Sequence, residues 1–146
     1  MSGGRTLVVG LGNPLRGDDA AGWAVVEQLA TRVDESAVDL RTVHQLLPEL
    51  ADPVSRARRA VFVDAAVGEH PGAVEVREVA PALPEGIFSH HMSPASLLAL
   101  ARALYGAAPA AFVVTITAQQ FELEGPLAGA VRDALPKAVD AILALL

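Results

Sequence analysis

The side chains best suited to chemistry are carboxylates and imidazoles at three places in the chain. Asp18 and Asp19 follow a Gly/Pro-rich loop, Asp64 ends an apolar run, and the pair His90 and His91 precedes a helix start. Carboxylate oxygens and a neutral imidazole together form a ligand set that suits nickel, zinc or iron. Two carboxylates and one imidazole would leave coordination positions open for water or for groups of a substrate. The sequence therefore indicates a candidate site that faces a cation.

The loop before the acidic pair has a competing interpretation as a phosphate cradle. Gly10 and Gly12 follow a strand-like run, as the first two glycines of a dinucleotide-binding fingerprint do. The third glycine is missing, and Pro14 and Leu15 stand where backbone amides would approach a pyrophosphate. Two acids at the helix start would also repel phosphate. A tight turn held by the side chain of Asn13 is the favoured interpretation.

Each acid also has a structural interpretation. An acid in the first turn of a helix caps backbone amides and complements the helix dipole, a contribution of roughly 0.3–1 kcal/mol. One of Asp18 and Asp19 is enough for that role, and the other is free to point elsewhere. Asp64 is harder to explain in this way, because a carboxylate at the end of an apolar strand is costly to bury without a partner.

The four histidines divide into two groups. His90 and His91 lie in a loop, where a histidine pair is commonly solvated, yet either imidazole is a good metal ligand. His44 ends an expected edge strand and His70 lies in a Pro/Gly turn. We therefore expect no functional role for His44 and His70.

Buried strands alternating with helices are expected to position these residues. Continuous apolar runs predict central strands over residues 6–11, 60–65 and 111–118, and alternating patterns predict more exposed strands over 38–43 and 73–79. Helices are predicted from Asp18 or Asp19 to about Val33, within 47–60, from Ser93-Pro94 to about Tyr105, and over 126–146 with a kink or division at Pro136. The alternation predicts an α/β fold with a mostly parallel sheet of about five strands and helices on both faces, in one domain over residues 1–146. Asp19 and Asp64 would then lie at the carboxyl ends of strands, where such sheets build their ligand sites.

Composition excludes several classes of function. The 146 residues carry a net charge of −6, so the chain has no basic footprint for nucleic acid. It contains no cysteine, which excludes disulfides, thiolate metal sites and cysteine nucleophiles. The apolar runs are shorter than the roughly 18–20 residues of a membrane-spanning helix, and the first residues do not resemble a signal peptide. We expect a cytoplasmic protein that binds neither nucleic acid nor membrane.

Three motifs together resemble the hydrogenase maturation proteases. The first is Val9-Gly10-Leu11-Gly12-Asn13-Pro14-x-x-x-Asp18-Asp19-x-x-Gly22, the second is Phe62-Val63-Asp64-Ala65, and the third is Ser89-His90-His91-Met92-Ser93-Pro94 with the leucine-rich helix that follows. Phe121-Glu122 and Gly125-Pro126-Leu127 also fit, so the resemblance covers essentially the whole chain. Ala20 departs from the pattern, because that family often has glycine there.

The resemblance implies a three-layer α/β/α sandwich of the phosphorylase/hydrolase-like kind and assigns the site. Carried over by position, Asp19, Asp64 and His90 would bind the metal and carry the catalysis, with His91 as the alternative to His90. Asp18 would then be left for the start of the helix. The family often has glutamate where Asp19 stands, so the shorter aspartate must approach a metal more closely.

The resemblance also implies a function. Members of the family are endopeptidases that remove the C-terminal extension of the large-subunit precursor of nickel–iron hydrogenases, and this precursor is the expected partner. The nickel is expected to arrive with the substrate, so that the free enzyme, expected to be a monomer, is metal-free. Water activated by the metal or by a carboxylate would attack the peptide carbonyl. The alternatives are a nickel-binding maturation scaffold without proteolysis and a nucleoside- or nucleotide-binding enzyme on a similar fold.

Overall fold

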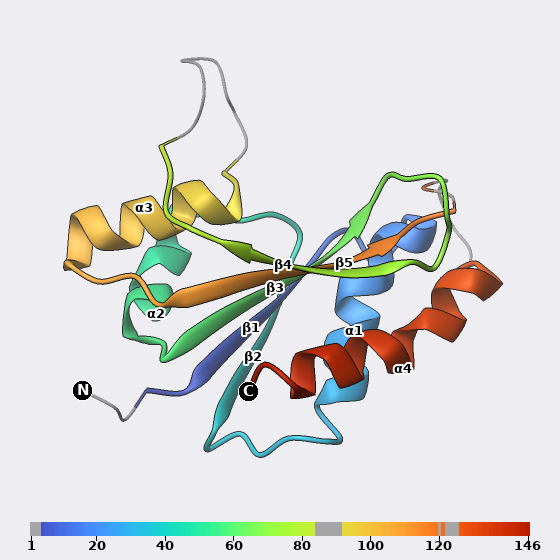
Figure 1. The fold of residues 1–146 in the computed structure, drawn as a ribbon, viewed down its shortest axis with the longest axis horizontal. Coiled ribbons are helices and arrows are strands. Elements are labelled where there is room, and N and C mark those ends of the chain that lie inside the picture. The colour runs from blue at the N-terminus through green and yellow to red at the C-terminus, as the bar shows by residue number, and fades with distance from the viewer. Residues whose placement is uncertain (1–3, 84–91, 120, 122–125) are drawn as a thin grey trace.

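A twisted five-stranded sheet forms the centre of the molecule (Figure 1). The computed structural model describes residues 4–83, 92–119, 121 and 126–146. The strands lie in the order β2-β1-β3-β5-β4, and all neighbours are parallel except the antiparallel pair β4 and β5. Their bounds are Thr6–Leu11 for β1, Val38–Val43 for β2, Arg59–Ala66 for β3, Val74–Val79 for β4 and Ala110–Thr117 for β5. The predicted sheet is confirmed, with an antiparallel strand at one edge.

Helices cover both faces of this sheet (Figure 1). One layer contains the 3-10 turn η1 (Gly17–Ala20), helix α1 (Ala21–Leu29) and helix α4 (Gly129–Leu143). The other contains the 3-10 turn η2 (Pro48–Leu50), helix α2 (Ala51–Arg56) and helix α3 (Pro94–Tyr105). Each layer packs on its own apolar cluster, α1 and α4 on one and α2 and α3 on the other. The predicted three-layer α/β/α sandwich is therefore confirmed.

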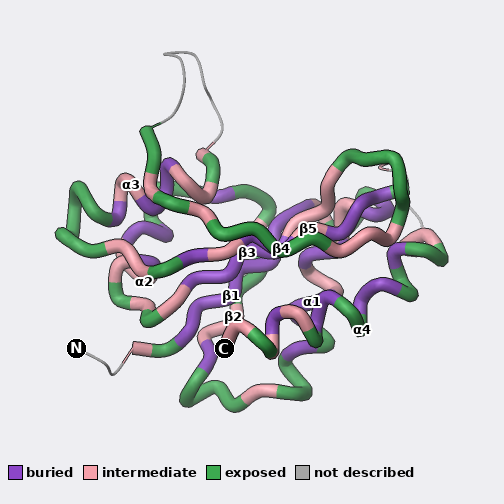
Figure 2. The backbone as a smooth tube through the Cα atoms, viewed as in Figure 1, coloured by how far each residue is buried: buried purple, intermediate pink, exposed green. Residues whose placement is uncertain are grey.

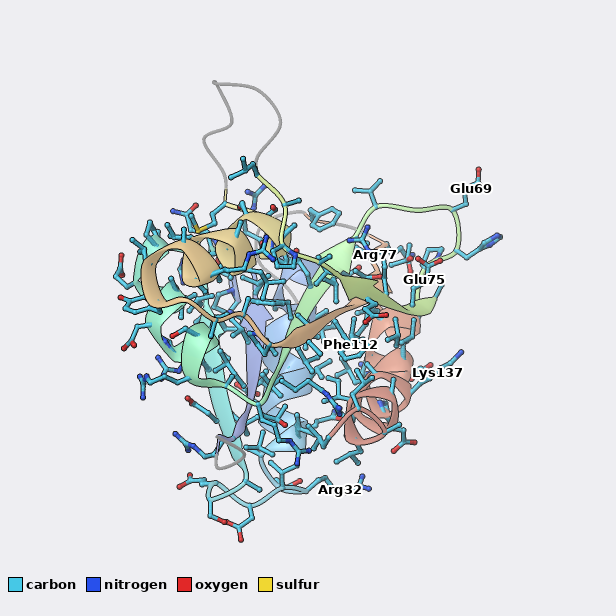
Figure 3. All side chains as sticks on the ribbon, turned by 60° about the vertical axis from the view of Figure 1, so that its left-hand side comes forward. Arg32, Glu69, Glu75, Arg77, Phe112 and Lys137 are labelled. Atoms are coloured by element: carbon cyan, nitrogen blue, oxygen red, sulfur yellow. The ribbon has the colours of Figure 1, made fainter. Side chains whose placement is uncertain are left out.

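Burial follows the position of each strand in the sheet (Figure 2). All six residues of β1 are buried, and so are Ala60 to Val63 of β3, because helices cover these strands on both sides. The edge strands β2 and β4 are largely half-buried or exposed. Charged side chains such as Glu75 and Arg77 project from β4 at the surface (Figure 3), and charges of this kind discourage pairing of an edge strand with another chain.

Two helices differ from the sequence-based expectation: α1 in where it ends, and α4 in where it begins and in how it passes Pro136. Helix α1 ends at Leu29 rather than near Val33, because the chain turns there and the N–H of Arg32 bonds to the carbonyl of Leu29. Helix α4 begins only at Gly129 and continues through Pro136, so of the two expected alternatives, a kink or a division, the division is wrong. Pro136 lies on the exposed side, where water can satisfy the carbonyl that loses its partner, while residues on both sides of it pack against the core. Within the described residues, no helix is long and apolar enough to span a membrane.

Candidate active site

Two glycines bring helix α1 directly onto the carboxyl ends of the central strands. A Cβ atom on Gly10 of β1 would lie 2.5 Å from the carbonyl oxygen of Gly22, and a Cβ on Gly22 would lie 2.5 Å from the carbonyl oxygen of Val63 in β3. Neither position has room for a side chain, so backbone packs on backbone. This contact fixes η1 and its two acids beside the end of β3, where Asp64 stands.

The loop between β1 and η1 satisfies its own amides. The N–H of Asn13 donates to Oδ2 of Asp19 at 2.8 Å, and the Oδ1 atom of Asn13 accepts from the N–H of Leu15 at 2.9 Å. The carbonyl of Asn13 accepts from Arg16, which closes a turn. Gly12 has φ of 129°, and a Cβ there would overlap the carbonyl oxygen of Asp19. Since these amides already have acceptors within the protein, the loop is not arranged as a phosphate cradle.

Asp18 is completely buried and is bonded to distant parts of the chain. Its Oδ2 accepts from the N–H of Gln119 at 2.8 Å and its Oδ1 accepts from the N–H of Ala128 at 2.7 Å. Ala128 is the N-cap residue of α4, whereas no side chain caps η1 or α1. The expectation that Asp18 caps its own helix is therefore wrong: its carboxylate holds the end of β5 and the start of α4 against η1.

Asp64 lies at the carboxyl end of β3 in a partly buried and acidic environment. The pKa of Asp64 is raised from its ordinary value of 3.8 to about 6, mainly by burial and to a smaller extent by the nearby carboxylate of Asp19, against a lowering by the backbone N–H of Ala65. The Oδ1 atom of Asp64 accepts that N–H at 2.9 Å. Two carboxylates from different elements therefore interact at one place, an arrangement that costs free energy unless a proton or a cation comes between them.

A cavity of about 360 Å³ opens where these acids meet. It lies among the ends of β1, β2 and β3 and the start of α3, at the rim predicted from the strand order. Among the described residues, its polar lining consists of Asp19, His44, Gln45, Asp64 and Ser93, and its apolar lining includes Leu11, Leu46, Met92 and Pro94. The cavity therefore offers acids and hydrogen-bond donors beside an apolar wall.

Helix α3 presents its first residues to this cavity. Ser93 is the N-cap residue, and its hydroxyl accepts from the N–H of Ser96 while the hydroxyl of Ser96 accepts from the N–H of Ser93. Pro94 occupies the first helical position, and Gly106 ends the helix with φ of 78°. The hydroxyl of Ser93 is thus committed to the helix cap.

The predicted site residues are only partly within the described chain. Asp19 and Asp64 line the same cavity. His90 and His91 lie outside the described residues, and the described chain resumes at Met92 on the cavity wall. Among the described residues, no group of three or more His, Cys, Asp or Glu side chains is close enough to hold a metal ion.

His44 lines the cavity although it was not among the predicted site residues. It follows Val43, the last residue of β2, and its ring packs against Trp23 with centroids 5.5 Å apart and planes tilted by 58°. The structure thus places His44 on the cavity wall, and the expectation that it has no functional role stays a prediction. The signal available in the sequence was its position directly after a strand parallel to β1, because such strands end at the same rim.

Comparison with known proteins relates the whole fold to one kind of enzyme. No protein-family model and no curated protein sequence matches the chain. Among solved structures it is similar to the hydrogenase maturating endopeptidase HybD from E. coli, with a TM-score of 0.79 and 25% identity over 97% of this chain and 91% of that one. It is also similar to the NiFe hydrogenase maturation protease HybD from Thermococcus kodakarensis, with a TM-score of 0.73 and 26% identity over 97% and 98% of the two chains.

A third similar structure extends the likeness in fold. The NiFe hydrogenase maturation protease HycI from Thermococcus kodakarensis gives a TM-score of 0.78 at 20% identity, over 97% of this chain and 92% of that one. The resemblance expected from the sequence motifs is thus confirmed along nearly the whole chain. These structural homologues are peptidases, in agreement with the predicted enzyme class.

Proposed function

We propose that this chain is an endopeptidase that removes the C-terminal extension of the large-subunit precursor of a nickel–iron hydrogenase after nickel has been inserted. The observation that carries the proposal is the convergence of Asp19 and Asp64 on one cavity at the carboxyl rim of the sheet. The likeness to maturation endopeptidases over nearly the whole chain supports it.

The chemistry of the two acids suits recognition of substrate-bound nickel. Carboxylate oxygens bind divalent cations, and an arriving cation would relieve the repulsion between Asp19 and Asp64, which adds to the effect of burial in raising the pKa of Asp64. The family resemblance adds His90, or alternatively His91, as the imidazole of the set. The precursor would dock through its own nickel, so the free enzyme needs no resident metal.

Hydrolysis is assigned to water rather than to a protein nucleophile. The chain has no cysteine, and the hydroxyl of Ser93 at the cavity is committed to the cap of α3. In its ionised form, Asp64 accepts a proton from a water molecule whose oxygen attacks the scissile carbonyl carbon. The C–N bond then breaks, and the proton passes to the amide nitrogen as it leaves as an amine. The products are a new C-terminal carboxylate and a free extension peptide.

The direct experiment incubates the chain with matched nickel-loaded and nickel-free precursor and follows the precursor by mass spectrometry. We expect loss of the C-terminal segment from the nickel-loaded precursor alone. A nickel-loaded precursor that is bound but remains intact would contradict the endopeptidase and favour a maturation scaffold. Equal cleavage of both forms would contradict recognition through nickel.

Two acid-to-amide variants make this experiment specific to the site. Asp64→Asn should leave the nickel-loaded precursor intact. Asp52→Asn removes a charge from α2 that is paired at the surface with Arg56, and it should cleave like the unmodified chain. Loss of cleavage in both variants would show an effect of net charge rather than of the cavity.

A further inference from the structure

The cavity needs a hydrogen-bond donor that the two acids do not supply in their ionised form. When water adds to a peptide carbonyl, the oxygen of that carbonyl gains negative charge, and a preorganised donor stabilises it. Ionised Asp19 and Asp64 only accept hydrogen bonds and would repel the oxyanion. If the cavity hydrolyses peptides, some other lining group must face the carbonyl oxygen.

Three described side chains of the lining can donate: His44, Gln45 and Ser93. The Ser93 hydroxyl is bonded within the capping box of α3. His44 and Gln45 are neighbours on the loop after β2, and of the two it is His44 whose ring is held by packing. A donor held in place before the substrate arrives loses less free energy on binding than a mobile one.

Trp23 is the residue that holds the imidazole. Its indole Nε1 donates to the carbonyl of Val43 at 3.0 Å, and its ring packs against His44. Trp23 comes four residues after Asp19, where η1 passes directly into α1, so one short segment carries both the acid and the residue that packs on His44. The packing on Trp23 thus brings His44 to the wall of the cavity that Asp19 also lines.

We propose that His44 donates a hydrogen bond to the oxygen of the scissile carbonyl, and that Trp23 is the positioning residue for its imidazole. This inference rests on the proposed peptidase function. Among the described residues, His44, Asp19 and Asp64 do not form a group close enough to hold a metal ion. The N–H of His44 stays on the ring throughout: the bond strengthens as the oxyanion forms and weakens again when the C–N bond breaks and the carbonyl returns.

The test measures kcat and KM for the nickel-loaded precursor with paired variants. His44→Ala should lower kcat by about 100-fold and change KM by less than about threefold, because the bond gains strength only in the transition state. His44→Gln keeps an N–H donor at similar reach and should recover about tenfold of that loss. His70→Ala removes an imidazole from an exposed turn and should leave both constants unchanged.

The role of Trp23 is tested by non-additivity. Trp23→Phe keeps a ring for packing but loses the bond to Val43, and it should lower kcat by about fivefold. In the His44→Ala background the same change should have almost no further effect, because the group it positions is already gone. A fivefold loss that persists in the double variant would overturn the positioning role. Thermal melting checks that each variant is folded.

The outcomes separate this inference from the proposed function. If the unmodified chain and His70→Ala cleave the precursor, the proposed peptidase function is supported. The role of His44 is then decided by the variants at position 44. His44→Ala with unchanged kcat would overturn the inference, as would a loss confined to KM, which would mean substrate docking. A larger kcat loss in Gln45→Ala than in His44→Ala would assign the donor to Gln45 instead. An unmodified chain without cleavage would overturn both proposals.

Discussion

The two neighbouring carboxylates of η1 lie in opposite environments: Asp18 on the inner side, buried against β5 and α4, and Asp19 on the outer side, at the cavity. On the inner side, Asp18 is completely buried and accepts two backbone N–H groups at 2.7 and 2.8 Å. On the outer side, Asp19 accepts one N–H from Asn13 and faces Asp64 across the cavity, where burial and the second charge raise the pKa of Asp64 to about 6. A carboxylate whose oxygens accept hydrogen bonds from the protein stabilises the fold. Two carboxylates that face each other lower its stability, and such arrangements are common at functional sites.

The two sides also depend on one another. Asp18 ties η1 to the end of β5 and to the first residues of α4, so the turn that carries Asp19 is anchored from behind. Gly10 and Gly22 hold the same turn against β1 and β3. The cavity is therefore built on a rigid base, as a site that must place reacting groups within a fraction of an ångström requires.

The largest expected effect is on catalysis at the outer side. Asp64→Asn keeps an acceptor for the N–H of Ala65 but cannot take a proton from water, so kcat/KM should fall by about 10³-fold or more. The extension released from a nickel-loaded precursor, followed by mass spectrometry over time, measures this rate. Activity within tenfold of the unmodified chain would remove Asp64 from the mechanism.

The next effect is on stability at the inner side. Asp18→Asn replaces one accepting oxygen by an NH₂ group that faces a backbone N–H, and the free energy of unfolding should fall by about 2–4 kcal/mol. Urea unfolding followed by circular dichroism measures the change. Asp133→Asn, on the exposed side of α4, is the matched control and should change stability by less than about 0.5 kcal/mol. An equal loss of unfolding free energy in the two variants would contradict the stabilising role of the buried carboxylate.

Gly12→Ala should lower both the stability of the fold and the activity of the cavity. The added methyl group meets the carbonyl of Asp19 and the residue must keep φ of 129°, so we expect a loss of about 2 kcal/mol in stability and about tenfold in kcat/KM. Gly106→Ala has a φ of 78° with open space around it, and it should cost only about 1 kcal/mol with full activity per folded molecule. Both glycines have positive φ, but only Gly12 lies against Asp19, so the difference between the two variants in stability and activity measures the effect of that contact.

The smallest expected effect is a pH dependence of stability. Because the folded state raises the pKa of Asp64 from 3.8 to about 6, it binds the proton more tightly than the unfolded chain does. The stability that Asp64 contributes in its protonated form is complete below about pH 4 and is lost as the pH rises through about 6, by about 1–2 kcal/mol once solvent screening of this half-buried group is included. The difference in unfolding free energy between Asp64→Asn and the unmodified chain should therefore grow from pH 4 to pH 7. A difference that is constant over this range would contradict the raised pKa.

The elements that depend on local sequence signals could be predicted from the sequence. The apolar run before Asp64 predicted β3, and Ser93-Pro94 with Gly106 predicted both ends of α3, because these signals act within a few residues. The end of α1 was misplaced because Val33 continues the apolar spacing although the chain has already turned at Leu29. Local patterns do not record such a turn.

The long-range contacts of the site depend on tertiary structure, which local sequence patterns record only indirectly. The partners of Asp18 are 101 and 110 residues away, and no spacing rule connects an acid at the start of one helix with the N-cap of another. His44 belongs to the cavity because β2 pairs with β1 in parallel, a register that depends on the whole sheet. Asp19 and Asp64 could be predicted as site residues from the sequence, because Asp19 follows a clear loop pattern and Asp64 follows a clear strand pattern.

The comparison between the two sides of η1 is tested most directly by measuring unfolding free energy and cleavage rate on the same preparations of Asp18→Asn and Asp19→Asn. The account predicts that Asp18→Asn loses about 2–4 kcal/mol of stability yet cleaves within about tenfold of the unmodified chain per folded molecule. It predicts that Asp19→Asn keeps its stability within about 1 kcal/mol and loses at least about 100-fold in cleavage of the nickel-loaded precursor. The reverse pattern, with Asp19→Asn active and Asp18→Asn stable but inactive, would contradict it.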